Sequence, residues 1–176
     1  MLSLAGSAGL AVALGACRKA QAENPNPLAP QAFAPVSGLA GRGMAALPAL
    51  NTADFERRVT LLHVWATWCP ICRTERETLN TLVGDPRYQL VGLAWRDAPD
   101  AVKSYLATAG NPYSALSLDD GRFAKTELRL VGVPTTFVIG RDRRILTRLT
   151  GPLTAERIAM ELTPAILKAQ ETTAQS

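Results

Sequence analysis

The chain has 176 residues, of which 47% are hydrophobic and 19% charged, as in one globular domain that needs no disulfide framework to fold. Its formal net charge is +4, but the basic residues are scattered along the chain. Their densest group, at residues 141–144, has the pattern of a solvated turn. The sequence contains no nucleic-acid-binding motif. A single histidine, His63, excludes a multi-histidine metal site, and three cysteines exclude a framework of simple pairs.

The first segment, residues 2–16, is small, apolar and uncharged. It is shorter than the roughly 20 residues of a membrane-spanning helix and is typical of the apolar part of a secretory signal. It ends in Leu14-Gly15-Ala16-Cys17, which resembles a bacterial lipoprotein cleavage site. We therefore expect residues 1–17 to be a lipoprotein-type signal with a lipidated Cys17; a plain signal peptide and a short uncleaved anchor are the alternatives.

The next segment, residues 18–32, is rich in proline, asparagine, glutamine and alanine and predicts a flexible tether. The folded domain is expected at 33–169, and a disordered tail at 170–176. A signal segment followed by a tether excludes a cytosolic location for the folded domain. We expect a periplasmic domain that is anchored to a membrane through its N-terminus.

The informative segment begins with residues 61–66, a nearly continuous apolar run that predicts a buried central strand. Cys69-Pro70-Ile71-Cys72 follows, and residues 73–82 are mainly helix-forming. Pro70 stands where the first turn of a helix tolerates proline, because its missing N–H would be unpaired there. The sequence therefore places Cys69 at the start of a helix that directly follows a buried strand.

This placement favours thiol chemistry. Free backbone N–H groups at a helix start stabilise a thiolate, and cysteine pKa values in such motifs fall from about 8.5 to about 3.5–7.5. Cys72 is one helical turn later on the same face, so we expect Cys69 to be the exposed attacking thiol and Cys72 the buried resolving thiol. Half of a zinc site and a purely structural disulfide are weaker alternatives, because zinc needs about four ligands and a ring this small restrains little chain. No metal or other cofactor is predicted.

The remaining elements follow from local patterns. Residues 89–95 predict a second central strand, and 99–109 an amphipathic helix. Residues 137–139 and 145–147 flank a turn and predict a hairpin. Residues 155–168 predict a closing helix with Thr154 as its cap.

Two motifs carry a resemblance to a family. Trp65-Ala66-Thr67-Trp68-Cys69-Pro70-Ile71-Cys72 and Gly132-Val133-Pro134-Thr135-Thr136-Phe137 resemble the thioredoxin-like proteins of bacterial envelopes, most closely the DsbE/CcmG branch. The resemblance runs from about residue 60 to 164. It implies an α/β thioredoxin fold, with a central mixed sheet flanked by helices and an inserted strand and helix between about residues 98 and 128.

The resemblance also implies roles for individual residues. Val133–Pro134 is expected to be a cis peptide beside the cysteines, where the backbone pairs with an extended substrate segment. Trp68 would shield Cys69 and offer a contact face. Glu75 corresponds to the acid that follows the cysteine motif in this branch and would line an acidic groove. Thr135 departs from the branch, which has glutamate after the cis-proline, and is more similar to the TlpA/ResA group.

His63 stands six positions before Cys69, where thioredoxins have a buried acid that relays a proton to or from the resolving thiol. The resemblance places His63 under Cys72. Histidine is the side chain that exchanges protons near neutral pH, so His63 is a candidate proton relay. The alternative is a buried histidine that is satisfied by the backbone.

The expected function is reduction of disulfides in apocytochrome c during cytochrome c maturation, with recharging by a membrane thiol-electron donor of the DsbD/CcdA type. One alternative is a general TlpA/ResA-like reductase that acts on another client, such as a copper-site protein. Another is a non-catalytic module that binds the apocytochrome. An oxidase or isomerase is disfavoured, because Cys-Pro-Ile-Cys lacks the histidine that strong oxidants carry between their cysteines.

Overall fold

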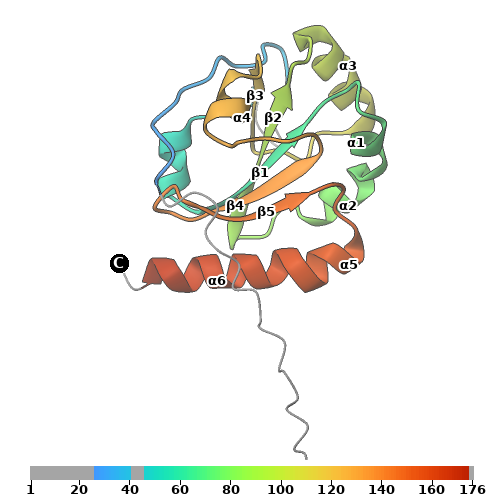
Figure 1. Ribbon diagram of the computed structural model, residues 1–176. Coiled ribbons are helices and arrows are strands. Elements are labelled where there is room, and N and C mark those ends of the chain that lie inside the picture. Colours follow the sequence, from blue (N-terminus) through green and yellow to red (C-terminus); the bar gives the residue numbers. More distant parts are fainter. Residues whose placement is uncertain (1–25, 41–45, 175–176) are drawn as a thin grey trace, which may run out of the picture.

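One mixed sheet organises the chain, for which a computed structural model describes residues 26–40 and 46–174. The strand order is β3-β2-β1-β4-β5 (Figure 1). The strands are β1 (Val59–Trp65), β2 (Tyr88–Trp95), β3 (Ala115–Asp119), β4 (Thr135–Ile139) and β5 (Ile145–Thr150). Parallel pairing joins β1 to β2 and β2 to β3, and antiparallel pairing joins β1 to β4 and β4 to β5. The expected mixed sheet is confirmed.

Helices cover both faces of this sheet. They are η1 (Thr52–Glu56), α1 (Pro70–Thr74), α2 (Arg76–Thr81), α3 (Pro99–Ala109), α4 (Arg122–Thr126), α5 (Ala155–Arg157), the π-helical η2 (Ile158–Leu162) and α6 (Thr163–Ala174). The inserted elements α3, β3 and α4 lie between β2 and β4, as expected. Within the described residues, no helix is both long and apolar enough to cross a membrane.

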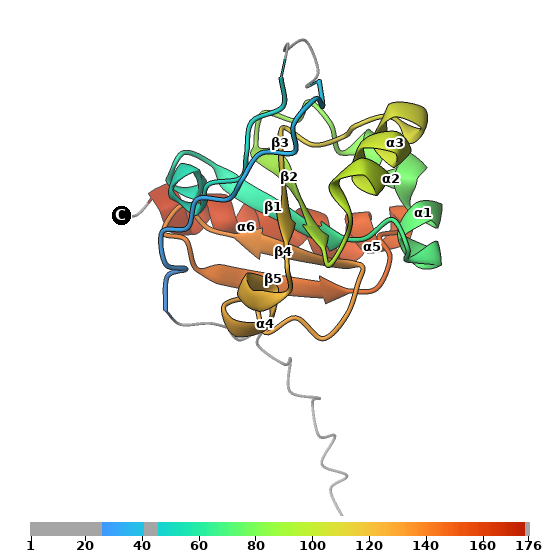
Figure 2. The same cartoon turned by 90° about the horizontal axis from the view of Figure 1, so that it is seen from above.

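The alternation of side chains along β1 divides the core in two. Leu61 and Trp65 belong to one buried cluster, with apolar residues of α2, α3 and α6. Leu62 and Val64 belong to a second cluster, with residues of η1 and α4. Figure 2 shows α6 behind the sheet, and α4 with the N-terminal segment in front of it. His63 shares its parity with Leu61 and Trp65, so its side chain enters the first layer, where α1 and α2 lie.

The ends of the domain differ from the prediction. Leu28 is fully buried in the second cluster, and its N–H donates to the carbonyl of Arg143 at 2.9 Å. Ala32 forms an isolated bridge with Asn51. The segment from Leu28 to residue 32 is thus part of the fold rather than a free tether, because its apolar side chain completes the core. At the other end α6 continues to Ala174, so residues 170–174 are helical where a tail was expected. Cys17 lies outside the described residues.

Candidate active site

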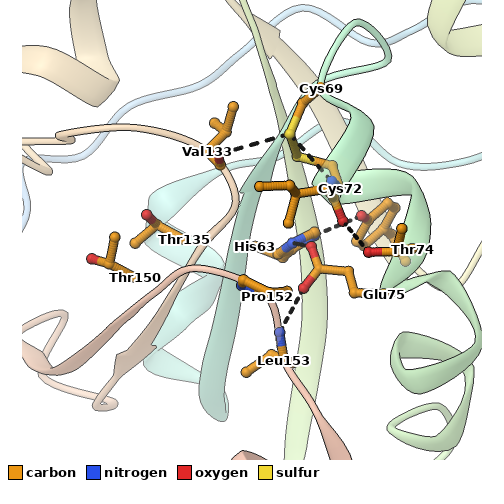
Figure 3. A network of polar contacts seen from close by, with 12 residues as sticks. His63, Cys69, Cys72, Thr74, Glu75, Val133, Thr135, Thr150, Pro152 and Leu153 are labelled. Carbon is orange, nitrogen blue, oxygen red and sulfur yellow. Dashed lines mark hydrogen bonds and ion pairs between the residues drawn. A yellow bond between two sulfur atoms is a disulfide. The ribbon is translucent and has the colours of Figure 1, made fainter.

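A disulfide joins Cys69 and Cys72 just beyond the end of β1 (Figure 3). Cys69 is the N-cap of α1, and Pro70 occupies the first helical position as expected. The Sγ of Cys69 accepts the backbone N–H of Cys72 at 3.2 Å. Cys69 is 5% exposed and Cys72 is 3% exposed, so the expected contrast between an exposed and a buried cysteine is small.

The peptide bond between Val133 and Pro134 is cis, as expected. The carbonyl oxygen of Val133 lies 3.7 Å from the Sγ of Cys69, which brings the second motif against the first. Thr135 is buried, and its hydroxyl donates to the carbonyl of Gly132 at 2.7 Å. Thr135 therefore braces the turn at residues 132–134 with its side chain.

Half-exposed apolar side chains flank the disulfide. Trp68 and Ile71 are each 52% exposed. The indole N–H of Trp68 donates to the carbonyl of Arg96 at 3.1 Å, and its ring lies 5.8 Å from that of Trp95. Trp68 is therefore fixed at its base, while about half of its surface remains open beside Cys69.

Thr67 is held from both sides directly before the cysteine motif. Asp97 accepts the backbone N–H of Thr67 at 2.5 Å and its hydroxyl at 2.8 Å. Arg73 donates from Nε to the carbonyl of Thr67 at 2.9 Å. Asp97 comes two residues after the end of β2, and the parallel strands β1 and β2 end at the same edge of the sheet. This relationship could have identified Asp97 as a site residue from the sequence.

A buried polar network lies below Cys72 (Figure 3). His63 Nε2 is 2.9 Å from Oε1 of Glu75, and His63 Nδ1 is 2.8 Å from the Tyr113 hydroxyl. The second oxygen of Glu75 accepts the backbone N–H of Leu153 at 2.8 Å. His63, Glu75 and Tyr113 are all at most 2% exposed. Tyr113 was not predicted as a site residue, because its contact with His63 joins residues 50 positions apart.

The direction of these hydrogen bonds follows from Tyr113. Burial raises the pKa of the Tyr113 hydroxyl well above its ordinary value, so the hydroxyl keeps its proton. The Arg76 guanidinium lies over the Tyr113 ring, 5.8 Å from the ring centroid. With Glu75 as a carboxylate and His63 as a neutral imidazole, Nε2–H of His63 donates to Glu75 and the Tyr113 hydroxyl donates to Nδ1 of His63. A directed chain then runs from the Tyr113 hydroxyl through His63 to Glu75.

The network corrects the groove interpretation of Glu75. Glu75 is 2% exposed and separates α1 from α2, where one continuous helix was expected. At that break its side chain turns inward to His63 and the backbone of Leu153, which satisfy its two oxygens. Glu75 therefore does not line a groove. His63 is hydrogen-bonded by two side chains rather than by the backbone.

Gly92 makes room for the network. It pairs with His63 between β2 and β1, and a Cβ there would lie 2.7 Å from Cδ1 of Leu116 and 2.9 Å from the Tyr113 ring. We expect Gly92→Ala to lower the free energy of unfolding by about 1–3 kcal/mol, because both neighbours are buried and must shift. Chemical denaturation measures this change. Gly132→Ala, which meets nothing within 4 Å, is the control, and equal stability of the two variants would contradict the prediction.

Comparison with known proteins identifies the family. The Redoxin family matches residues 44–162, about two thirds of the chain. The chain belongs to the Redoxin family. Its relatives include the thiol:disulfide interchange proteins HelX of Rhodobacter capsulatus and CycY of Rhizobium leguminosarum bv. viciae. HelX is 37% identical over 111 residues, 63% of this chain and 62% of HelX. CycY is 35% identical over 125 residues, 71% of this chain and 67% of CycY.

Solved structures confirm the thioredoxin-type fold. A thiol:disulfide interchange protein of the thioredoxin family from Chlorobium tepidum aligns with a TM-score of 0.61 at 19% identity, covering 83% of this chain and 97% of that one. A DsbF homologue from Corynebacterium diphtheriae aligns with a TM-score of 0.62 at 20% identity, covering 81% and 85%. At these identities the likeness concerns the fold alone.

Proposed function

We propose that this protein is a thiol:disulfide oxidoreductase that acts as a reductant in the cell envelope. The observation that carries the proposal is the Cys69–Cys72 disulfide at the start of α1, with the Cys69 sulfur beside the Val133 carbonyl and on the Cys72 N–H. The relatives named above are thiol:disulfide interchange proteins. This chain spans about three fifths to two thirds of their length, so their activity is carried over here as part of the proposal.

The exchange has two steps. In the reduced protein, the Cys69 thiolate attacks one sulfur of a client disulfide; the client S–S bond breaks, a mixed disulfide forms, and the released client thiolate takes up a proton. The Cys72 thiolate then attacks the Cys69 sulfur and releases the second client thiol. Two electrons pass to the client, and the Cys69–Cys72 disulfide remains.

The local geometry supports Cys69 as the attacking group. The N–H of Cys72 points at the Cys69 sulfur, and a hydrogen bond to an ionised sulfur is stronger than one to a neutral thiol. The open surfaces of Trp68 and Ile71 offer apolar contact to a client segment. The backbone at Val133, next to the cis-proline, is the place where an extended client would pair.

Cys72 must lose its proton before it can resolve the mixed disulfide, and His63 with Glu75 lies beneath it (Figure 3). We propose that this pair receives that proton. His63 can bind a second proton at Nδ1 once the Tyr113 hydroxyl turns and accepts instead of donating. The imidazolium would then face the Glu75 carboxylate, which compensates its charge.

For the client we propose apocytochrome c, with a membrane thiol-electron donor of the DsbD/CcdA type to recharge the pair; the DsbE/CcmG resemblance supports both. Thr135, in place of glutamate after the cis-proline, favours the second candidate, a TlpA/ResA-like reductase for another client. Anchoring through Cys17 in the periplasm is part of the same proposal. One structural relative is described as a secreted thiol-disulfide isomerase from Corynebacterium glutamicum.

The reduction potential of the Cys69–Cys72 pair tests the direction of transfer. We expect a value near that of thioredoxin, about −270 mV, or in the range of the glutaredoxins, about −200 to −230 mV. The measurement equilibrates the protein with a dithiothreitol redox buffer and quantifies the free thiols. A value near −120 mV, as in a strong oxidant such as DsbA, would contradict the reductase proposal and indicate a disulfide donor.

A further inference from the structure

Four arginines that are distant in sequence line one pocket of about 270 Å³, at the end of the molecule away from the disulfide. They are Arg57 and Arg58 before β1, Arg87 before β2, and Arg141 in the turn between β4 and β5. No acidic residue lines this pocket. In Figure 1 the turn between β4 and β5 lies on the left and α1 on the right.

The arginines differ in how far their charges are already compensated. Arg57 pairs with Asp54 at 3.3 Å, and Arg87 pairs with Asp85 at 2.6 Å. Arg141 donates from Nε to the backbone carbonyl of Glu56, which carries no net charge. Among the described residues, neither Arg58 nor Arg141 has a carboxylate partner within ion-pair distance. The residues that line the pocket thus include two arginines without a carboxylate partner and two that have one.

We propose that this pocket binds a phosphate group. Guanidinium groups bind phosphate oxygens through paired N–H donors, and converging arginines are the usual protein partner of a phosphate. The cavity, at about 270 Å³, has room for one such group. The proposal is independent of the thiol chemistry, because the seven residues of β1 separate the pocket from the cysteine motif by about 20 Å.

Two sources could supply the phosphate: a lipid headgroup or a soluble phosphate compound. The course of the chain favours the lipid. The N–H of Leu28 donates to the carbonyl of Arg143, which lies in the same turn as Arg141. In the sequence, the apolar run at residues 2–16 precedes Leu28. A headgroup bound here would hold this end of the domain at a membrane and direct the cysteine motif away from it.

The experiment compares the full chain with two double variants of equal charge. Arg58→Gln/Arg141→Gln removes the uncompensated pair, and Arg122→Gln/Arg144→Gln removes two exposed arginines that lie outside the pocket. Calorimetric titration with inorganic phosphate at constant ionic strength is the first arm. The second arm is co-sedimentation with vesicles of phosphatidylcholine, with and without phosphatidylglycerol. Thermal unfolding verifies that each variant is folded, and Arg58→Gln alone serves if the double variant is not.

We expect the pocket variant to lose about tenfold in binding and the control to lose less than about twofold. A loss confined to the phosphatidylglycerol vesicles identifies a lipid headgroup; a loss confined to inorganic phosphate identifies a soluble ligand. Equal losses of binding in both double variants would show that binding follows from general charge attraction, and would overturn the proposal. It is also overturned if the wild-type chain binds neither probe.

Discussion

Cys72→Ser is expected to accumulate a covalent mixed disulfide between Cys69 and the client. The variant keeps the attacking sulfur and its activation, because the group that donates to Cys69 is the backbone N–H of residue 72 and not its side chain. It lacks the sulfur that would release the client. Expression in the envelope, acid quenching and mass spectrometry of the captured adduct identify the client. An apocytochrome c in the adduct supports cytochrome c maturation, and a copper-site protein supports the second candidate.

Cys69→Ser is the matched control. It removes the sulfur that lies at the start of α1 and accepts the Cys72 N–H, whereas Cys72 lies inside that helix. We expect no adduct and a loss of about a thousandfold or more in the rate of disulfide exchange. A Cys69→Ser variant that still supports maturation of the client would contradict an exchange mechanism. The protein would then act as a binding module.

Glu75→Ala is expected to lower the free energy of unfolding by about 3–5 kcal/mol. The substitution leaves the N–H of His63 and the N–H of Leu153 buried without an acceptor. It also breaks the buried chain of hydrogen bonds that runs from Tyr113 through His63 to Glu75. For a chain of this size the melting temperature should fall by roughly 10 °C, measured by calorimetry.

The control for this prediction is Glu77→Ala, which removes an exposed acid of α2 and should change stability by less than about 0.5 kcal/mol. Glu75→Gln keeps one acceptor oxygen and should lose about half as much as alanine. His63→Asn separates a structural role from a proton role, through the pH dependence of disulfide exchange. An unchanged pH profile in His63→Asn would refute the relay, and a Glu75→Ala variant as stable as Glu77→Ala would refute the network.

Local patterns were sufficient for much of the fold. The amphipathic helix at 99–109 has the bounds of α3, and Thr154 caps α5 as predicted, with its side chain accepting the N–H of Arg157 at 3.2 Å. The prediction of one uninterrupted helix after the cysteines was wrong. At the break between α1 and α2, the side chain of Glu75 turns inward, where it forms hydrogen bonds with His63 and Leu153. The folded domain also begins earlier than predicted, because Leu28 is buried against side chains contributed by η1 and α4.

The sequence by itself determined where the cysteine pair lies, since a strand, a turn and a proline-containing helix start are encoded within residues 60–74. The tertiary structure alone decided what surrounds the cysteines. Tyr113 and Leu153 reach the network from 50 and 78 positions away, and Asp97 reaches Thr67 from 30. The arginine pocket has the same origin, with one side chain from position 87 and another from 141. Contacts of this kind depend on the order of the strands and on the packing of helices against the sheet. No local sequence pattern predicts which distant residues the strand order and the packing bring together.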